Sequence, residues 1–232
     1  MDTGNNNNIF TLVKANHLPY GRDFPGHVLT GRFSNGKLIP DIIASYLNIT
    51  DTVPPYLDRN LTNEQLLSGV CFASAGSGLD SLTTGITNAI SMSNQIEQHF
   101  NDYVERLKGI VGENKAKQIL GDALVAISAG SNDFIINFYD GHTRSYSFTI
   151  TEYQNLMQDN LIAFVTRLYE IGCRKFAVSG LPPIGCIPFQ IEFRHEVACV
   201  DGQNSDSKDY NQILAKKLLD LQTKLEGSRI VF

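Results

Sequence analysis

The sequence predicts an α/β fold in which helices cover a parallel sheet. Short apolar runs that end in glycine-containing turns are typical of buried parallel strands. Long segments with apolar residues at every third or fourth position lie between these runs and predict amphipathic helices. Strands that alternate with helices in this way indicate a three-layer sandwich of the flavodoxin-like kind, in which ligands bind beyond the carboxyl ends of the strands.

The first half of the chain contains a long loop, one predicted strand and three predicted helices. Residues 1–36 are rich in Gly, Asn and Pro, which predicts an ordered loop. The apolar run 69–74 predicts a buried strand that ends in the turn 75–78. Helical spacing is found over 38–47, 90–110 and 113–123.

The second half alternates strands and helices more regularly. Buried strands are predicted over 123–128, 175–179 and 229–232. An amphipathic helix is predicted over 151–171, with Thr151 as its N-cap. A second helix is predicted over 206–225, and Gly227 stops it. The first two of these strands end in the turns 129–133 and 180–185, which places both turns at the ligand-binding edge of the sheet.

Composition and charge exclude several classes of protein. The 232 residues carry 24 acidic and 19 basic side chains, and 42% of them are apolar, as in an ordinary globular domain. A net charge of −5 argues against nucleic acid as a partner. No apolar run approaches the roughly 18 residues that span a bilayer, and the polar N-terminus does not resemble a signal peptide.

The four cysteines and two sequons bear on cellular location. Cys71 and Cys173 lie in apolar surroundings and are expected to be small buried hydrophobic residues. Cys186 and Cys199 bracket a polar, irregular stretch, and a disulfide is expected there if the protein is secreted. No CxxC pair occurs, so no metal site is expected. The sequons Asn48-Ile49-Thr50 and Asn60-Leu61-Thr62 permit glycosylation in a secreted protein.

Two residues beyond the predicted strands could stabilise a developing negative charge. The backbone N–H of Gly76 could donate to an oxyanion, although Gly76 could equally serve only a tight strand-to-loop turn. Asn132 offers an amide donor, although its side chain could merely cap the turn through its own backbone. The turn 75–78 lacks the spacing of a dinucleotide or phosphate-binding loop, which disfavours a nucleotide-binding domain and any nucleotide cofactor.

The sequence offers oxyanion donors without a recognisable nucleophile or base. The Gly-x-Ser-x-Gly signature is absent. No histidine has an acidic partner at an informative spacing, so all five are expected to be surface residues: His17, His27, His99, His142 and His195.

Six motifs explain this imbalance, and they span essentially the whole chain in a fixed order. They are Asp2-Thr3-Gly4-Asn5-Asn6-Asn7, Pro19-Tyr20-Gly21-Arg22-Asp23-Phe24, Thr30-Gly31-Arg32-Phe33-Ser34-Asn35-Gly36-Lys37, Phe72-Ala73-Ser74-Ala75-Gly76-Ser77-Gly78, Ser128-Ala129-Gly130-Ser131-Asn132-Asp133 and Gly180-Leu181-Pro182-Pro183-Ile184-Gly185-Cys186. Together they resemble the plant GDSL esterase/lipase family, a branch of the SGNH hydrolases.

The resemblance assigns roles to the two candidate donors. Members of that family use a Ser in a Gly-Asp-Ser motif as nucleophile, a Gly and an Asn as oxyanion donors, and an Asp-x-x-His motif for the base. Gly76 matches the oxyanion Gly, and Asn132 matches the oxyanion Asn. The resemblance further implies a secreted protein that acts on small-molecule or lipid esters and takes part in lipid degradation.

The same resemblance indicates that catalytic motifs are missing. The Gly-Asp-Ser motif would fall just before Met1, and the Asp-x-x-His motif well after Phe232. We therefore expect residues 1–232 to form a single, incomplete domain that lacks the first strand and the C-terminal catalytic segment. The sequence predicts a carboxylic-ester hydrolase whose chain is inactive by itself. The alternative is a non-catalytic pseudoenzyme that binds a lipid or a cell-wall ester.

Overall fold

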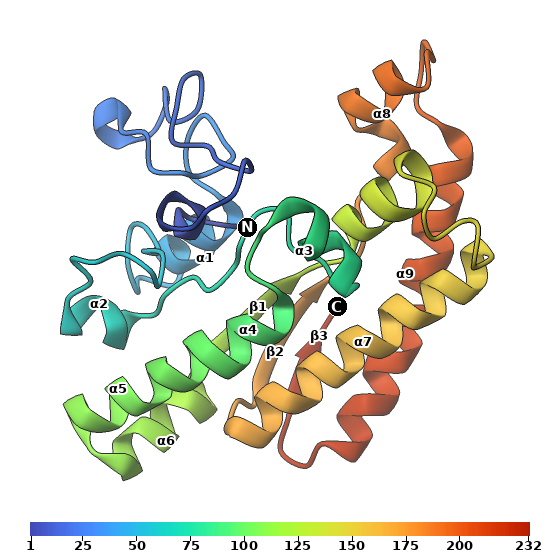
Figure 1. Cartoon of the computed structure of the whole chain (residues 1–232). Helices are drawn as coiled ribbons and strands as arrows, with labels where there is room; N and C mark the ends of the chain where they lie inside the picture. Colours follow the sequence, from blue (N-terminus) through green and yellow to red (C-terminus); the bar gives the residue numbers. More distant parts are fainter. The chain divides into compact units, whose positions relative to one another are not determined.

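The computed structural model describes all 232 residues, and the chain divides into two compact units (Figure 1). The first unit comprises Met1–Ser77 and Thr84–Gln118, and the second comprises Gly78–Thr83 and Ile119–Phe232. The expectation of one domain over residues 1–232 stays a prediction.

The first unit is built from short helices and loops. Its helices are α1 (Ile39–Tyr46), α2 (Asn63–Ser68), α4 (Met92–Asn94) and α5 (Asn101–Val111), with the 3₁₀ helices η1 (Asn5–Asn8) and η2 (Pro25–His27) and the π-helical segment η3 (Gln95–Phe100). The chain passes between the units after Ser77, within α3 (Ser81–Thr87) and within α6 (Glu113–Asp122). The helices predicted over 38–47, 90–110 and 113–123 are therefore confirmed, and the second of them contains the π-helical turn η3.

The strand predicted over 69–74 does not form, which corrects the sequence prediction. Cys71 makes one isolated parallel bridge with Pro55 and no ladder. The Cys71 carbonyl accepts from the backbone N–H of Tyr56 at 2.9 Å and from the Asn5 side-chain amide at 2.8 Å. The Ala73 carbonyl accepts from the same amide at 2.8 Å. Because buried carbonyls require a donor, the Asn5 side chain takes the place that a neighbouring strand would fill.

The second unit contains the sheet. Its strands are β1 (Leu124–Ser128), β2 (Lys175–Ser179) and β3 (Arg229–Val231), and its helices are α7 (Ile150–Ile171), α8 (Pro188–Phe193) and α9 (Asp201–Lys224), with the π-helical η4 (Asp133–Asp140) and the 3₁₀ helix η5 (Ile184–Cys186). The strands are parallel in the order β1-β2-β3, with Lys175 opposite both Leu124 and Arg229. The predicted α/β class with a parallel sheet is confirmed.

Two long helices join the strands, and their starts differ from the predictions. Thr149, and not Thr151, is the N-cap of α7. The backbone N–H of Thr149 donates to the Glu152 carboxylate at 2.8 Å, and the Thr149 hydroxyl accepts from the backbone N–H of Glu152. This reciprocal capping box satisfies two otherwise unpaired donors. Helix α9 begins at Asp201, before the predicted start at Asp206, because Val200 supplies the extended N-cap.

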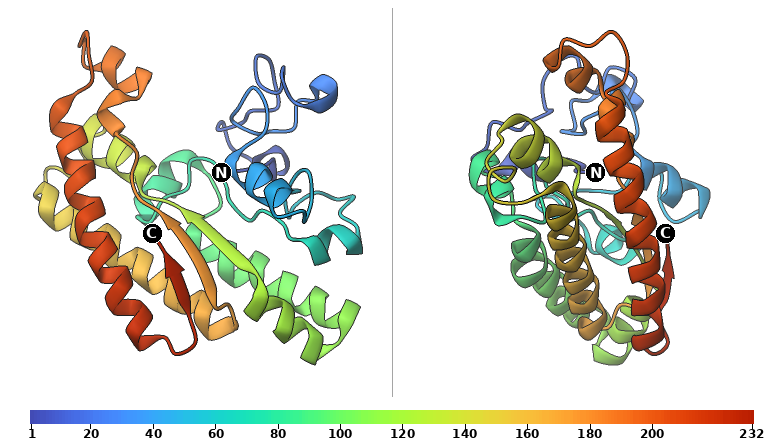
Figure 2. Two further views of the ribbon diagram at one scale, coloured as in Figure 1. Left: turned by 180° about the vertical axis from the view of Figure 1, so that it is seen from behind. Right: turned by 90° about the vertical axis from the view of Figure 1, so that its right-hand side faces the viewer.

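Aromatic and amide contacts hold η4 against α7 and α9, which lie side by side in Figures 1 and 2. The Phe134 ring packs edge-on against Tyr153 of α7 and Tyr210 of α9, with centroids 5.4 and 5.6 Å away. The Gln158 amide donates to the carbonyl of Tyr210 at 3.0 Å. The first turn of η4 is thus fixed directly beyond the carboxyl end of β1.

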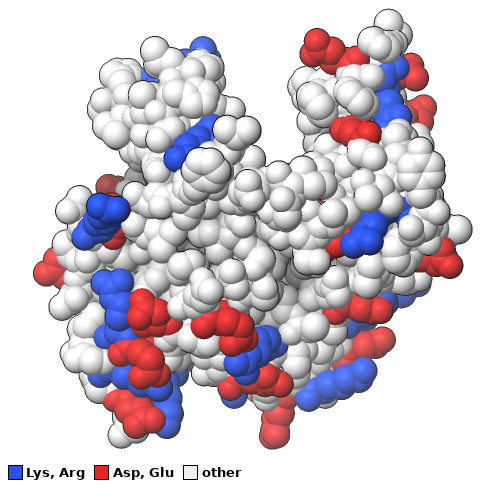
Figure 3. Space-filling model, viewed as in Figure 1, with Lys and Arg blue, Asp and Glu red and all other residues white.

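Charged side chains of both signs are mixed along α5 and α6, as the face drawn in Figure 3 shows. Lys108 pairs with Glu105 at 2.7 Å and Lys117 with Glu113 at 3.3 Å, and three of these four side chains are well exposed. Exposed pairs of this kind contribute at most about 1 kcal/mol each. No helix combines the length and the apolar character needed to cross a membrane.

The cysteines behave as the sequence predicts. Cys186 and Cys199 form a disulfide that closes the segment carrying α8. Cys71 and Cys173 are buried free thiols. Burial raises the pKa of both thiols, that of Cys173 to about 12, so neither is an activated nucleophile.

Removal of this disulfide is expected to weaken the second unit measurably. The bond joins residues 13 apart. Closing a loop of that size lowers the entropy of the unfolded chain and thereby stabilises the folded state by about 3 kcal/mol. The double variant Cys186→Ser/Cys199→Ser should therefore lose unfolding free energy of that order in urea titration. The variant Cys71→Ser leaves the bond intact and serves as the control. Reaction of Cys186 or Cys199 with a thiol probe in the native, unreduced protein would contradict the pairing.

Candidate functional site

Gly76 lies in the first unit at a turn that only glycine fits. Its φ is +84°, and an added Cβ would lie 3.1 Å from the Cβ of Thr87 and 3.2 Å from a methyl group of Val13. The Gly76 carbonyl accepts a 2.8 Å hydrogen bond from the Thr87 hydroxyl. The Gly76 N–H, in contrast, donates to no acceptor in the chain. The turn therefore holds the Gly76 N–H in a fixed direction and leaves it able to donate a hydrogen bond to a ligand.

The N-terminal Asp-Thr-Gly-Asn-Asn motif holds the segment that leads to Gly76. The Asp2 carboxylate accepts from the backbone N–H groups of Gly4 and Asn5 at 2.8 and 2.7 Å, and from that of Ala75 at 3.2 Å. The Asn6 amide donates to the Ala75 carbonyl at 2.9 Å. Buried side chains thus anchor both the N–H and the carbonyl of Ala75, and the second bond fixes the peptide group that carries the Gly76 N–H.

Asn132 lies in the second unit, immediately before η4 and four residues beyond the end of β1. Gly130 permits this abrupt change of direction, because its φ is +111° and an added Cβ would lie 3.0 Å from the Leu181 side chain. Asn132 is the N-cap residue of η4, yet its side chain makes no capping hydrogen bond. The choice between an oxyanion donor and a residue that only caps the turn stays a prediction for Asn132.

Asp133 is the centre of a buried polar network that sequence analysis missed. Its carboxylate accepts from the Thr83 hydroxyl at 2.5 Å and from the backbone N–H groups of Leu79 and Asp80 at 3.0 and 2.9 Å. A side chain on Gly78 would collide with the carboxylate. The residue after Asn132 thereby fixes the segment 78–83, which follows Gly76 in the sequence.

A second ion pair encloses the same segment. Arg144 donates two hydrogen bonds to Asp80, at 2.6 and 2.8 Å, and the Tyr153 hydroxyl donates a third at 3.3 Å. Burial acts to raise the pKa of Asp80, but the Arg144 hydrogen bonds and charge hold it below its usual value. Asp80 is therefore ionised and paired, whereas Asp133 is surrounded by neutral donors.

The environment of Asp133 gives a specific pH dependence. Burial raises the pKa of its carboxyl to about 6, outweighing the donors from Thr83, Asp80 and Leu79. Because this exceeds the unfolded value of about 3.9, the folded state binds the proton more tightly. The resulting stabilisation is complete below pH ~4 and is lost as the pH rises through about 6.

We therefore expect the unfolding free energy of the wild type to fall between pH 4 and 6, relative to that of Asp133→Asn. Denaturant titration at several pH values measures this difference, and the Asp41→Asn variant provides the comparison because the Asp41 pKa is shifted downward. Parallel pH profiles for wild type and Asp133→Asn would show that Asp133 is ionised throughout.

The histidines do not form a catalytic pair in this chain. Four are exposed, and His99 is half-buried within η3: His17, His27, His142, His195 and His99. Burial lowers the pKa of His99, outweighing the charge of Asp102. No group of three or more His, Cys, Asp or Glu side chains is placed to hold a metal ion.

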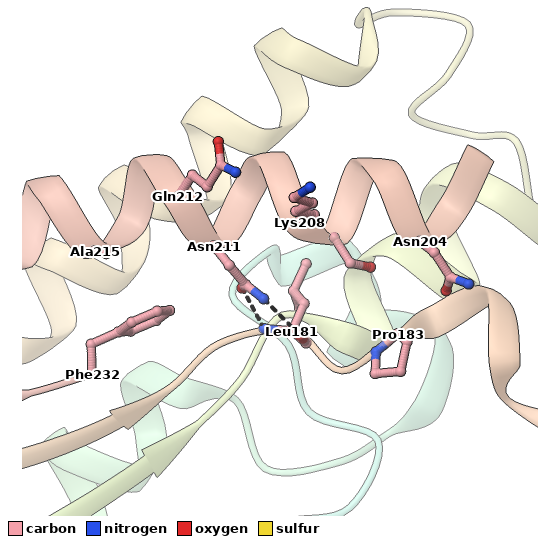
Figure 4. Close-up of a pocket in the computed structure, with 9 residues that line it drawn as sticks. Leu181, Pro183, Asn204, Lys208, Asn211, Gln212, Ala215 and Phe232 are labelled. Carbon is pink, nitrogen blue, oxygen red and sulfur yellow. Dashed lines mark hydrogen bonds between the residues drawn. The ribbon is translucent and has the colours of Figure 1, made fainter. Parts of the chain in front are cut away.

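A groove of about 480 Å³ runs along α9 in the second unit (Figure 4). The Asn211 side chain forms one wall and is bonded twice to the backbone of Leu181, at 2.7 and 2.9 Å. Lys208 and Phe232 also line the groove. Asn132 is not among its lining residues, so the groove is separate from the predicted oxyanion donor.

The two predicted donors belong to different units. Gly76 is in the first and Asn132 is in the second. Their joint role in an oxyanion hole stays a prediction. The role of Asp133 could not be predicted, because its place at the end of a motif does not indicate burial and its partners lie 50–54 residues away.

Comparison with known proteins places the whole chain in one group. The model of the family "GDSL-like Lipase/Acylhydrolase" matches residues 2–232. In Arabidopsis thaliana, GDSL esterase/lipase At1g06990 is 50% identical over 236 residues, covering 100% of this chain and 65% of that protein. GDSL esterase/lipase At5g45960 is 44% identical, covering 100% of this chain and 64% of that protein. The chain thus spans about two thirds of the length of these relatives.

Proposed function

Because this chain belongs to the GDSL-like lipase/acylhydrolase family, we propose that it forms part of a hydrolase that acts on carboxylic esters. The resemblance to plant GDSL esterases/lipases that the six motifs indicate is confirmed by the match over residues 2–232. That match is the observation on which the proposed function rests. Acyl or lipid esters are the proposed substrates.

The proposed reaction is acyl transfer to a serine followed by hydrolysis. The serine hydroxyl attacks the ester carbonyl, and the tetrahedral oxyanion accepts hydrogen bonds from the Gly76 N–H and the Asn132 amide. The alcohol leaves, and water activated by a histidine hydrolyses the acyl-enzyme. The uncommitted Gly76 N–H and the position of Asn132 just beyond the end of β1 support these assignments.

We place the nucleophile and the Asp–His pair outside these 232 residues. The sequence contains neither a Gly-Asp-Ser motif nor an Asp-x-x-His motif. The exposure of four histidines, none of them paired with a carboxylate, supports this placement. In this proposal the chain supplies the oxyanion donors and their supporting network, and it needs further residues for turnover.

Secretion and a role in lipid degradation belong to the same proposal. The Cys186–Cys199 disulfide supports an oxidising compartment. Both sequon asparagines, Asn48 and Asn60, are exposed and therefore accessible to glycosylation.

The direct test is an esterase assay on short-chain p-nitrophenyl esters. The 232 residues alone are expected to show no turnover above buffer, whereas a form extended to the length of the relatives should hydrolyse these esters. Turnover by the 232 residues that is abolished in Asn132→Ala would mean that the nucleophile lies within them. Failure of the extended form to hydrolyse any ester would favour the non-catalytic alternative.

A further inference from the structure

Helix α1 presents three large apolar side chains to solvent and buries its only charged one. Asp41 and Ala44 are buried, whereas Ile39 is 64% exposed, Ile42 58% and Tyr46 86%. Positions 39, 42 and 46 share one face of a helix. One face of α1 is therefore apolar and exposed, and it forms an apolar patch on the surface of the first unit.

Hydrogen bonds prevent α1 from turning this face inward. The guanidinium of Arg32 donates to both oxygens of Asp41 at 2.8 Å, and the backbone N–H groups of Leu38 and Val53 donate to the same carboxylate at 2.8 Å. A rotation of the helix would break all four bonds and leave Arg32, itself 4% exposed, as an unpaired buried charge. Contiguous exposed apolar surface of this kind usually contacts another molecule or group.

A glycosylation sequon lies directly at the end of this patch. Asn48 follows the last turn of α1, two residues after Tyr46, and is exposed. Its φ is +53°, and its backbone N–H donates to the Ser45 carbonyl at 3.0 Å. The flanking residues Leu47 and Ile49 are exposed apolar side chains as well. The nitrogen to be modified is therefore accessible and surrounded by uncovered apolar surface.

We propose that Asn48 carries an N-linked glycan whose first N-acetylglucosamine packs on the ring of Tyr46 and covers the C-terminal part of the α1 apolar face. The inference rests on the secretion that the proposed function includes. A sugar ring has an apolar face of C–H groups, which suits the negative face of an exposed aromatic ring. Ile42 lies about one turn, roughly 5.4 Å, before Tyr46, within reach of the same short oligosaccharide.

The covalent step is the ordinary transfer of an oligosaccharide from a lipid-linked diphosphate donor. The sugar C1–O bond to the diphosphate breaks and a bond from C1 to Asn48 Nδ2 forms. The Asn48 amide loses one proton, and the lipid diphosphate leaves with the bonding electron pair. The host's glycosylation machinery supplies the donor, and no oxidant or reductant is involved.

The second sequon lacks this arrangement and provides an internal comparison. Asn60 is preceded by Asp58 and Arg59, and its backbone N–H donates to the Asp58 carboxylate at 2.9 Å. No aromatic ring stands two residues before it. We therefore expect a glycan at Asn60 to have no packing surface comparable with Tyr46.

The test expresses the full chain in a eukaryotic host behind a heterologous cleavable signal peptide, so that the result depends neither on the native route of export nor on esterase activity. Secreted protein is digested, deglycosylated by a peptide N-glycosidase in ¹⁸O-water, and analysed by mass spectrometry for conversion of Asn48 to labelled aspartate. The variants Asn48→Gln and Thr50→Ala remove the sequon by different changes, and Thr50→Ser retains it. Tyr46→Ala removes only the aromatic ring.

We expect occupied Asn48 in the wild type and in Thr50→Ser, and none in Asn48→Gln or Thr50→Ala. In Tyr46→Ala, enzymatic removal of the glycan should lower the unfolding free energy less than in the wild type, because the ring–sugar contact is already absent. An equal loss in both proteins would overturn the packing on Tyr46. Binding of an apolar fluorescent dye should rise about twofold in both sequon-free variants, as the patch is uncovered. Unmodified Asn48 in the secreted wild type would overturn the site, and unchanged dye binding in both sequon-free variants would overturn the covering role. Esterase results bear on neither outcome.

Discussion

Asp41→Ala is expected to destabilise the first unit by about 3–5 kcal/mol, because the substitution leaves a buried arginine without its counter-ion. Asp41 is fully buried, and its two oxygens accept both Arg32 bonds and the backbone N–H groups of Leu38 and Val53. Burial acts to raise the pKa of Asp41, but these donors and the Arg32 charge hold it below its usual value. The carboxylate is therefore ionised at neutral pH. Substitution by alanine removes its ion pair with Arg32 and all of its hydrogen bonds.

Urea titration followed by circular dichroism measures the loss, and hydrogen exchange at the amides of Leu38 and Val53 localises it. Asp23→Ala is the matched control. Asp23 also pairs with an arginine, Arg22, but both side chains are more than 60% exposed. Such a pair contributes about 0–1 kcal/mol. Equal effects of the two substitutions would contradict the buried status of the Arg32–Asp41 pair.

Asn132→Ala is expected to lower kcat by about 10²–10³-fold in a form of the protein that is long enough to hydrolyse esters, with a much smaller change in KM. The Asn132 amide donates to an oxygen that acquires negative charge only in the transition state, so its removal leaves ester binding largely intact. Its place is fixed by the neighbouring Asp133 network, and alanine is a good helix-forming residue at the start of η4.

Two controls separate catalysis from folding in this experiment. Asn16→Ala removes an exposed amide in the first unit and should leave both kinetic constants unchanged. The unfolding free energy of Asn132→Ala is measured alongside, so that a loss of kcat in a protein of near-wild-type stability is assigned to catalysis and not to unfolding. An Asn132→Ala enzyme whose kcat is close to that of the wild type would remove Asn132 from the oxyanion hole.

Elements governed by local pattern could be predicted from sequence. The strands at 124–128 and 175–179 are short apolar runs between long helices, and their pattern predicts a parallel sheet without knowledge of partners. The same holds for α7 and α9, whose apolar positions recur at helical spacing. The disulfide was also predictable, because Cys186 and Cys199 bracket one short loop.

Elements that depend on residues distant in the sequence could not be predicted. The run 69–74 has the composition of a buried strand, but the distant Asn5 side chain donates to two of its carbonyls, those of Cys71 and Ala73. No local pattern in the sequence reveals that partner. The burial of Asp133 depends on donors from segment 78–83. Gly76 and Asn132 could be predicted as oxyanion donors because a glycine and an asparagine each follow a predicted strand. A supporting residue such as Asp133 has no comparable sequence signal.

The central claim is that these 232 residues supply oxyanion donors to a nucleophile that lies outside them. Covalent labelling by a p-nitrophenyl alkylphosphonate tests it most directly, because the nucleophile displaces p-nitrophenolate and retains the phosphonyl group. In the extended, active form we expect mass spectrometry to locate the label on a single serine outside residues 1–232. The 232-residue chain alone should remain unlabelled. A label on any serine within residues 1–232 would contradict the claim.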